Sequence, residues 1–492
     1  MSDRNALFLV SDFAPLTSVG RIRTQKMCKF LPQFGWKTSV LTFDPPPGTL
    51  TDHALLDEVP PETKVYRVPC PQPIEAPVRW ASQVARRFRS QCRDDGVPPE
   101  HARPGDATNV SPPGNPGWLN QLSHGVDRFK RALTRRLMIP DEGMSAIPSM
   151  ARRAVDIIRR ERIDVLVTSV PGFSPWLAAV LAGRRTGVPV VVDYRDLWHR
   201  DVLRTWVGPL RTRFELILER WALSRTDAVV TVSQGKTHFV RALDRAAGNK
   251  PYATIYNGFD ADDLAGIEAA RPKPDAERLL LLYTGRLYKH RRIDPLIESV
   301  GRLLVRGRVR RDELRIRMLG LIERRQRECI DRIVERYDLR DVVDIGGYVT
   351  RRDALAQQSG ADALVLIVDP GETADGVLPG KITEYMGLGR FVLAVCPPGE
   401  ARSILQRYGH AAWASADEPH RLDAMLANLI DRWRTDPASV TRRVDSAAVP
   451  TRRANAADMA HVLTRVAEAS VQKKGSVTRR GAPTQRTPTV EC

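Results

Sequence analysis

The stretch 163–196, IDVLVTSVPGFSPWLAAVLAGRRTGVPVVVDYRD, contains the pattern that decides the fold. Two apolar runs, IDVLVTSV and PVVVDYRD, flank a segment from about Trp176 to Arg185 that we interpret as a helix. Continuous apolar runs are typical of strands buried on both faces of a parallel sheet. Pro171 and Pro175 interrupt the charge-free run, which argues against a membrane span. The stretch therefore predicts a strand, a helix and a second parallel strand.

The same alternation extends through most of the chain. Further strands are predicted in the first half at ALFLVSDF (6–13), KTSVLTF (37–43) and DAVVTVS (227–233), with helices near 21–34 and 212–223. After a charged, proline-containing link at 268–278, a second set of strands is predicted at LLLLYTG (279–285), LRIRMLG (314–320), VVDIGGY (342–348), ADALVLIV (361–368) and FVLAVC (391–396). This pattern predicts an α/β protein of two doubly wound domains, with a ligand cleft between them.

The charge balance points to an anionic partner. The 492 residues contain 76 Lys+Arg against 58 Asp+Glu, a formal net charge of +18, which suits a phosphorylated substrate, a membrane surface or nucleic acid. Nucleic acid is the least favoured of these, because aromatic residues make up only 6% of the chain and do not interleave with the basic stretches. The six cysteines are scattered without zinc-like spacing, which predicts a reducing cytoplasm and no metal site.

A segment within the first half departs from the strand and helix alternation. Residues 94–117 are rich in proline and glycine and predict a mobile loop. The flanking stretches, 78–93 and 118–137, resemble basic amphipathic helices, with Leu122, Val126, Phe129 and Leu133 on one face of the second. Such helices can bind an anionic membrane, although ordinary surface helices packed on the domain would show the same pattern.

Two groups of residues at predicted strand ends suit phosphate. Gly20 follows the first strand and opens a helix, where backbone amides and the helix dipole favour an anion. Cations cluster at the carboxyl end of the strand at 279–285, in GRLYKHRR, where a doubly wound sheet binds its ligands. A tight turn in the first case and a solvated charged loop in the second are the alternatives. Gly235-Lys236-Thr237 lacks the upstream glycine of a P-loop.

The segment GVLPGKITEYMG, residues 376–387, places a carboxylate beside an apolar helix face. Ile382, Tyr385 and Met386 form that face, and Glu384 lies among them in sequence. Glu384 is either a solvent-facing position or a ligand-binding carboxylate at the start of a helix. Asp260 and Asp262 resemble a metal-binding pair, but their position before a predicted helix favours a helix cap.

Several of these motifs together resemble glycosyltransferase family 4. They are PLTSVGRIR, FLPQFGWKTSVLT, IPDEGMSAIPSMARRAVDII, TSVPGFSPWLAAVLA, VVVDYRDLW, DAVVTVS, YNGFD, YTGRL and PGKITEYMGLGRFVLAV, in order over about residues 6–60 and 140–465. The resemblance is greatest to members that build bacterial surface polysaccharides. It implies the GT-B fold, in which two Rossmann-like domains face each other across a cleft.

The resemblance also implies roles for single residues. Arg286 matches the arginine that holds the donor's diphosphate, and Glu384 matches the second glutamate of the family's E-x7-E motif, which binds ribose. Gly376 stands where the first glutamate is expected, and Arg195 and Asp196 stand where many relatives carry a histidine that touches the transferred sugar. The predicted catalytic residues are Arg286, Arg291, Arg195 and Asp196. The predicted donor-binding residues are Gly20, Arg21, Gly285, Lys289, Arg292, Gly376, Gly380, Lys381 and Glu384.

The implied activity is retaining transfer of a sugar from a nucleotide diphosphate sugar to a glycan or polyprenyl-linked acceptor. No protein nucleophile, metal or cofactor is expected, and the enzyme is expected in the cytoplasm, bound peripherally to the inner face of the plasma membrane. Because Gly376 replaces a carboxylate, a nucleotide-sugar epimerase and an inactive GT-B partner subunit remain alternatives. The predicted domains are 1–265 with an insertion at 72–140, 266–445, a helix at 446–470 that crosses back to the first domain, and a disordered basic tail at 471–492.

Overall fold

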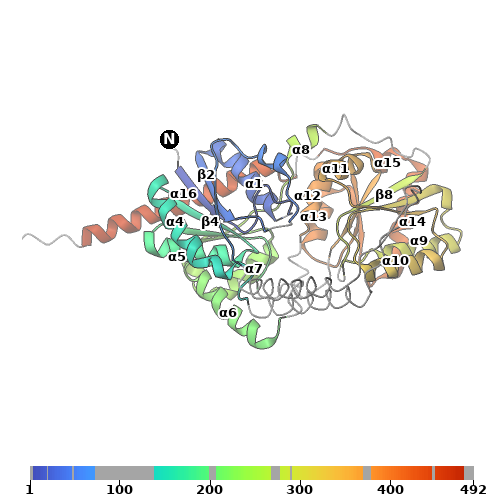
Figure 1. Cartoon of the computed structure of the whole chain (residues 1–492). Helices are drawn as coiled ribbons and strands as arrows, with labels where there is room; N and C mark the ends of the chain where they lie inside the picture. The colour runs from blue at the N-terminus through green and yellow to red at the C-terminus, as the bar shows by residue number, and fades with distance from the viewer. Residues whose placement is uncertain are drawn as a thin grey trace, which may run out of the picture.

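The chain forms two parallel β-sheets, each flanked by helices on both faces (Figure 1). The computed structural model describes residues 4–18, 20–46, 49–71, 138–198, 207–266, 278–288, 291–368, 378–445 and 449–480. Figure 1 shows the two sheets side by side, the first in blue and green and the second in yellow and orange. The predicted pair of doubly wound α/β domains is therefore confirmed.

The first sheet has seven strands in the order β3-β2-β1-β4-β5-β6-β7. All neighbouring strands pair in parallel. The strands are β1 (Arg4–Leu9), β2 (Trp36–Phe43), β3 (Lys64–Val68), β4 (Val165–Val170), β5 (Val190–Tyr194), β6 (Ala228–Thr231) and β7 (Tyr252–Thr254). The strand order reverses between β1 and β4, so the chain leaves these two strands in opposite directions, and doubly wound sheets bind their ligands at the carboxyl ends of such strands.

The second sheet has six parallel strands in the order β10-β9-β8-β11-β12-β13. The strands are β8 (Leu279–Thr284), β9 (Leu314–Leu319), β10 (Val343–Gly347), β11 (Ala363–Ile367), β12 (Phe391–Val395) and β13 (Ala411–Ala414). Its order reverses between β8 and β11. The strands of the two sheets lie on either side of the predicted domain boundary at 265/266, whose position stays a prediction.

The helices follow the predicted alternation. Those associated with the first sheet are α1 (Arg21–Phe30), which a 3-10 helix η1 (Leu31–Phe34) continues, α4 (Ile147–Glu161), α5 (Phe173–Thr186), α6 (Pro209–Leu223), α7 (Gln234–Leu243) and α8 (Ala261–Ala265). Those of the second part are α9 (Asp294–Val305), α10 (Arg324–Arg336), α11 (Arg351–Gly360), α12 (Lys381–Gly387), α13 (Glu400–Tyr408), α14 (Pro419–Thr435) and α15 (Ala438–Thr441), and the last helix is α16 (Arg452–Arg480).

Each face of the first sheet has its own hydrophobic core. Leu7 and Leu9 of β1 pack with α4 and α5 on one face, whereas Ala6 and Phe8 pack with α1 and α16 on the other. This division follows from the alternation of side chains along a strand. It explains why the strands read as continuous apolar runs, since neither face meets water.

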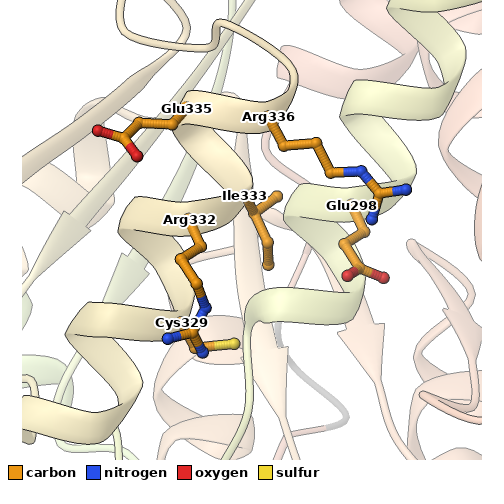
Figure 2. Close-up of a pocket in the computed structure, with 6 residues that line it drawn as sticks. All are labelled: Glu298, Cys329, Arg332, Ile333, Glu335 and Arg336. Atoms are coloured by element: carbon orange, nitrogen blue, oxygen red, sulfur yellow. The ribbon is translucent and has the colours of Figure 1, made fainter.

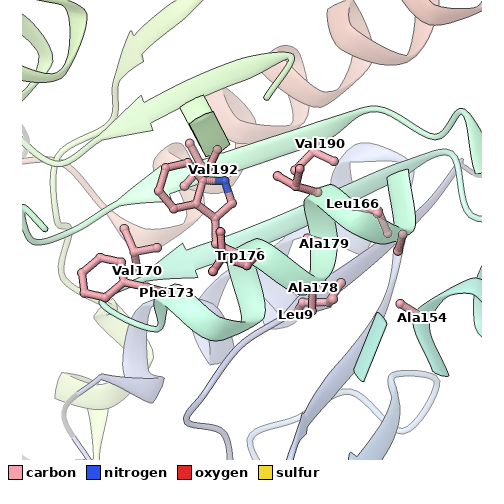
Figure 3. Close-up of a cluster of buried hydrophobic side chains, with 14 of the residues drawn as sticks. Leu9, Ala154, Leu166, Val170, Phe173, Trp176, Ala178, Ala179, Val190 and Val192 are labelled. Carbon is pink, nitrogen blue, oxygen red and sulfur yellow. The ribbon is translucent and has the colours of Figure 1, made fainter. Parts of the chain in front are cut away.

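Trp176 is one of the two buried tryptophans in the core between β4, β5 and α5 (Figure 3). The residue is fully buried, and its indole Nε1 donates a hydrogen bond to Thr226 Oγ1 at 3.1 Å. Its ring lies edge-on to Tyr194, with centroids 5.5 Å apart. The bond to Thr226 satisfies the one polar atom that this large side chain brings into the core.

Helix α16 carries the end of the chain back to the first sheet. Met459, Leu463 and Val466 of α16 pack in the same core as Phe8 and Trp36. The helix runs from Arg452 to Arg480, so it begins later than the predicted 446–470 helix and extends ten residues beyond it. The predicted disorder from residue 471 is therefore wrong as far as Arg480, and residues 481–492 lie outside the described part.

The predicted insertion falls almost wholly outside the described residues. Of the segment 72–140, the structure describes only residues 138–140. The amphipathic helices predicted at 78–93 and 118–137 therefore stay predictions. Across the described ranges, the helices include none with the length and apolar character that a bilayer span needs.

Replacing Trp176 with alanine should strongly destabilise the first domain. The change leaves a large cavity and removes the donor to Thr226, so we expect the free energy of unfolding to fall by about 3–5 kcal/mol. Urea unfolding gives the loss, and hydrogen exchange of peptides from α5 assigns it to this domain. Leu321→Ala is the control, because Leu321 is 57% exposed and its truncation should change stability by less than about 0.5 kcal/mol. Equal losses in the two variants would contradict this account of the core.

Candidate functional site

The two reversal points place loops from both domains at the candidate site. In the first sheet these loops follow β1, β4 and β5, and in the second they follow β8 and β11. The two sides meet near Asn257, which follows β7. Asn257 accepts a hydrogen bond from Arg23 of α1 at 3.5 Å, and its amide nitrogen lies 3.8 Å from the place that a Cβ on Gly380 would occupy. Gly380 immediately precedes α12, so the start of α12 faces the first domain.

The loop after β8 depends on two glycines. Gly285 has φ +130° and Gly320, which follows β9, has φ +129°, a region that favours glycine. A Cβ on Gly285 would overlap the Lys381 ammonium, and one on Gly320 would overlap the backbone of Gly285. The predicted site residue Gly285 thus lets Lys381 approach the end of β8 closely.

Lys381 is enclosed at the first turn of α12. Its Nζ donates a hydrogen bond to the carbonyl oxygen of Thr284, the last residue of β8, and lies 5.1 Å from the centre of the Tyr283 ring. Burial, together with the nearby charge of Arg291, lowers the pKa of Lys381 to about 8. A cation that is costly to bury alone becomes favourable when an anion binds beside it, so this position is suited to phosphate.

The predicted arginines of this loop have different partners. Arg286 forms an exposed ion pair with Glu323 at 2.9 Å, and Arg292 pairs with Asp294 at the start of α9. Arg291 lies over the Tyr288 ring at 5.1 Å, and its charge acts on Lys381. The structure therefore brings Arg291 and Lys381 together, whereas it directs Arg292 toward Asp294. Lys289 lies outside the described residues.

Glu384 lies one turn after Lys381 and is largely enclosed. Its side chain is 20% exposed, and Oε2 pairs with Arg351 of α11 at 3.3 Å. Arg351 also pairs with Asp263 of α8 at 3.3 Å, and Asp263 pairs with Lys26 of α1 at 2.6 Å. Burial alone would lower the pKa of Arg351, but Glu384 and Asp263 outweigh it and raise the pKa. Glu384 is thus the end of a chain of ion pairs that reaches from α12 to the first domain.

The apolar face of α12 is confirmed. Ile382, Tyr385 and Met386 are buried in the second domain. Gly376, the residue in place of the first motif glutamate, lies outside the described residues.

The loop after β1 is held by Arg195 from the end of β5. The Arg195 guanidinium donates to the carbonyl oxygen of Gly20 and, through Nε, to that of Val170 at 3.2 Å. Burial lowers the pKa of Arg195. A Cβ on Gly20 would lie 2.9 Å from an Asp12 carboxylate oxygen, so a larger residue would disturb this loop. Arg195 therefore joins the ends of β1, β4 and β5.

The other two predicted residues on this side differ in exposure. Arg21 is only 6% exposed and donates to Gln25 within α1, and burial lowers the pKa of Arg21. The side chain of Asp196 is 58% exposed and pairs with Lys236 of α7 at 3.3 Å.

Sequence reasoning missed a buried ion pair beneath the first-domain loops. Arg23 of α1 donates two hydrogen bonds to Asp193 of β5, at 2.8 and 2.9 Å, and a further one to the carbonyl oxygen of Ile255. Both charged side chains are almost fully buried. Asp193 within an otherwise apolar strand was the available signal, since a buried carboxylate needs a partner.

Two further cations that the sequence did not reveal lie near Glu384 and Asn257. Arg351 pairs with Glu384, and Arg452 opens α16 with its guanidinium near Asn257. Burial, with Arg23 and Arg351 nearby, lowers the pKa of Arg452 to about 10. Neither arginine stands in a recognisable motif, and each comes from an element distant in sequence from α12.

Glu400, the first residue of α13, links the two domains directly. Its carboxylate accepts hydrogen bonds from the backbone N–H groups of Gln234 and Gly235 at 2.9 and 3.2 Å, and from the Tyr256 hydroxyl at 2.7 Å. Burial and Glu400 raise the pKa of Tyr256 to about 12. The first turn of α7, which resembled the end of a P-loop, thus binds a carboxylate of the second domain.

A surface pocket between α9 and α10 does not coincide with these residues. Figure 2 shows this pocket of about 700 Å³ between α9 and α10, lined by Glu298, Cys329, Arg332, Ile333, Glu335 and Arg336. None of the predicted site residues lines it. Within the described ranges, histidine, cysteine and carboxylate side chains form no group suited to a metal ion.

Comparison with known proteins shows which families and structures the chain is similar to. Residues 110–263 match the family model described as Glycosyltransferase Family 4. Anabaena Alr3699/HepE, crystallised in complex with UDP, has 14% identity and a TM-score of 0.53, and the match covers 96% of this chain and 100% of that one. A sucrose-phosphate synthase of Thermosynechococcus elongatus has 15% identity and a TM-score of 0.51 over 97% and 99% of the two chains.

A third similar structure is the N-terminal domain of a Candida albicans trehalose-6-phosphate phosphatase, with 10% identity and a TM-score of 0.57 over 94% of this chain and 97% of that one. No curated protein sequence matches the chain. These similarities show the GT-B fold. The family-model match covers less than half of the 492 residues and agrees with the resemblance that the motifs indicated.

Lys381→Met should remove a pH dependence of stability. Lys381 releases its proton near pH 8 in the folded protein and near pH 10.5 in the unfolded chain, so between these values the unfolded state binds more protons. The wild-type free energy of unfolding should therefore rise with pH relative to that of the variant, by up to about 1.4 kcal/mol per pH unit. Urea unfolding of both proteins across this pH range measures the difference. If the two free energies of unfolding change with pH in parallel, Lys381 is not buried as described.

Glu400→Ala should loosen the contact between the domains. The change removes an acceptor shared by Gln234, Gly235 and Tyr256, and charge-assisted hydrogen bonds of this kind contribute about 1.5–3 kcal/mol. We expect a larger radius of gyration by small-angle X-ray scattering.

Glu418→Ala is the matched control for this change, since the partners of Glu418, which include Arg402 and Arg421, belong to the second domain itself. A radius of gyration that is the same in both variants and the wild type would mean that Glu400 does not hold the domains together.

Proposed function

We propose that the protein transfers a sugar, with retention at the anomeric carbon, from a nucleotide diphosphate sugar to a glycan or polyprenyl-linked acceptor in surface polysaccharide biosynthesis. The observation that carries the proposal is the pairing of Lys381 and Glu384 on the first turn of α12, at the carboxyl edge of the second sheet. Residues three apart on a helix lie on one side of it. A cation and a carboxylate so placed suit a diphosphate and the ribose hydroxyls of one nucleotide.

The diphosphate would bind between Lys381 and the loop after β8. Lys381 and Arg291 already interact, and the exposed Arg286 side chain belongs to the same loop. The enclosed Lys381 ammonium donates to a carbonyl oxygen and lies over the Tyr283 ring, so an incoming phosphate would add negative charge that stabilises it. The backbone N–H groups at the start of α12, after Gly380, would add further positive potential for the diphosphate.

Ribose would bind at Glu384. Arg351 at 3.3 Å holds the carboxylate in place. This contact reduces the rotamer freedom that Glu384 would lose on binding, so the carboxylate is partly preorganised. The UDP in the similar Anabaena structure makes UDP-sugars the first donors to test.

Catalysis would consist mainly of stabilising the departing diphosphate. Negative charge grows on the leaving group as the glycosidic bond breaks, and cations fixed in a partly enclosed site stabilise it without reorganising. Lys381, Arg286 and Arg291 are proposed for this role. The donor phosphate itself would accept the acceptor's proton during front-face attack, so no protein nucleophile and no metal ion is assigned.

The first domain would bind the acceptor and complete the cleft. The Arg195 guanidinium donates a hydrogen bond to the Gly20 carbonyl oxygen and so holds that loop, which supports a positioning role for Arg195. The exposed Asp196 is the residue that we propose contacts the transferred sugar. A polyprenyl-linked acceptor would place the enzyme peripherally at the cytoplasmic face of the plasma membrane. Closure of the domains over the donor would exclude water from the reacting sugar.

Glu384→Ala should weaken donor binding. Loss of hydrogen bonds between the ribose hydroxyls and a carboxylate costs about 1.5–3 kcal/mol, which corresponds to a dissociation constant roughly 10–150 times larger. A thermal-shift screen against UDP-, GDP-, ADP- and dTDP-sugars identifies the donor, and calorimetry then measures the variant. Glu418→Ala is the control, because Glu418 is a carboxylate of the same domain that pairs with Arg421 instead. Unchanged donor affinity in Glu384→Ala would overturn the ribose assignment.

One further experiment separates transfer from the alternatives. An epimerase converts the donor without an acceptor, and an inactive partner subunit releases nothing. Free nucleotide diphosphate that forms only when a glycan or lipid-linked acceptor is present would support the transferase and exclude both.

A further inference from the structure

Helix α6 presents an apolar stripe to the outside of the protein. Leu210 is 87% exposed, Phe214 53% and Ile217 60%. Their spacing of four and three residues places them on one face of the helix. Figure 1 shows α6 at the outer edge of the first domain, away from the second sheet. Three large apolar side chains in a row are costly in water, so this face is suited to a partner.

The charges of α6 are divided between its two faces. Both of its carboxylates point inward: Glu215 pairs with Arg211 at 2.7 Å, and Glu219 accepts a hydrogen bond from the buried Tyr194 hydroxyl. Glu215 is 5% exposed and Glu219 is fully buried. All residues of α6 are described, and its exposed face carries arginine, Arg213, but no carboxylate. The outward face is therefore apolar and cationic.

A cationic pocket lies beyond the end of α6 and extends this surface. Arg225, two residues after the helix ends, stacks over the Trp221 ring at 4.7 Å and lines a pocket of about 470 Å³. Arg184, Arg465 and Lys473 line the same pocket, against one carboxylate, Asp227. The oxygen Oδ2 of Asp227 already accepts the backbone N–H of Val190 at 2.8 Å. The pocket thus adds positive charge at the end of the helix.

We propose that α6 lies on an anionic lipid bilayer. Leu210, Phe214 and Ile217 would enter the boundary between headgroups and acyl chains, while Arg213 and Arg225 would contact lipid phosphates. Interfacial helices bind through buried apolar area together with cations attracted to anionic headgroups. The exposed face of α6 is thus the surface that would meet the membrane. Only the lipid-linked nature of the acceptor rests on the proposed function.

This placement fits the position of the candidate site. The loop with Arg195 and Asp196 leaves β5, and the chain then continues to α6. A lipid-linked acceptor could then approach the first domain without leaving the membrane.

Two other occupants of the stripe are conceivable. Arg211 donates to the carbonyl oxygen of Met138 at 2.8 Å, so the segment 72–137 rejoins the described structure beside α6 and could cover it. A second copy of the chain is the other. We favour the bilayer because Arg213 and Arg225 complement anionic headgroups and the exposed face of α6 carries no carboxylate.

The test is vesicle co-sedimentation of the full-length protein. The triple variant Leu210→Gln/Phe214→Gln/Ile217→Gln changes only exposed side chains, so folding should be preserved, which nucleotide-induced thermal shift confirms. Its binding to mixed phosphatidylcholine–phosphatidylglycerol vesicles should fall by about tenfold or more, the effect of one or two apolar side chains. Arg213→Glu should weaken binding by roughly fivefold, and wild-type binding should be weak on phosphatidylcholine alone. Val305→Gln is the control, because Val305 is an equally exposed apolar residue of α9.

Three results would overturn the proposal. Vesicle binding of the triple variant at the wild-type level would exclude α6 as the contact. A wild-type dimer that the triple variant converts to a monomer, with vesicle binding unchanged, would assign the stripe to a second copy. A cysteine at position 214 that reacts slowly with a soluble thiol reagent in the full chain, but quickly after deletion of residues 72–137, would assign it to that segment. Donor binding is measured separately in each case, so failure here leaves the proposed function standing.

Discussion

Burial of both faces of two parallel sheets is the constraint on which the rest of this structure depends. Strands such as β4 and β5 are enclosed on either side, so they have almost no place for polar side chains except at their ends. Helices must return the chain between strands, and their amino ends gather at the carboxyl edge of each sheet. Charge that serves a ligand therefore collects at two reversal points, one in each domain.

Charged contacts connect the two edges. Glu384, Arg351, Asp263 and Lys26 form a continuous chain of ion pairs from α12 to α1, and Glu400 binds the start of α7. Contacts of this kind depend on direction and distance and contribute less than apolar burial, so they can break and re-form when domains move. Because Glu384 is both the proposed ribose ligand and the end of this chain of ion pairs, nucleotide binding would be linked to the position of α8 through Arg351.

The sequence predicted the fold more completely than the site. The two α/β domains could be predicted from continuous apolar runs, because a strand that is buried on both faces has apolar residues at consecutive positions. The helices α5 and α6 were found where the pattern placed them, and α12 has the predicted apolar face. The extent of α16 was misjudged, because its last turns are polar and basic and read as a tail. The helix continues to Arg480 all the same.

Residues that act through distant partners were the ones the sequence did not identify. Arg351, Arg452 and the pair of Arg23 with Asp193 come from separate elements, and nothing in their local spacing indicates that they meet. Likewise, Arg291 and Arg292 are equivalent in sequence, but only the fold turns one toward Lys381 and the other toward Asp294.

By itself, the sequence determined the α/β class, the two-domain order and the helix that carries Glu384, because these depend on local periodicity. Only the tertiary structure decided which charges lie together and which face of α6 stays exposed, because those outcomes depend on contacts between segments far apart along the chain.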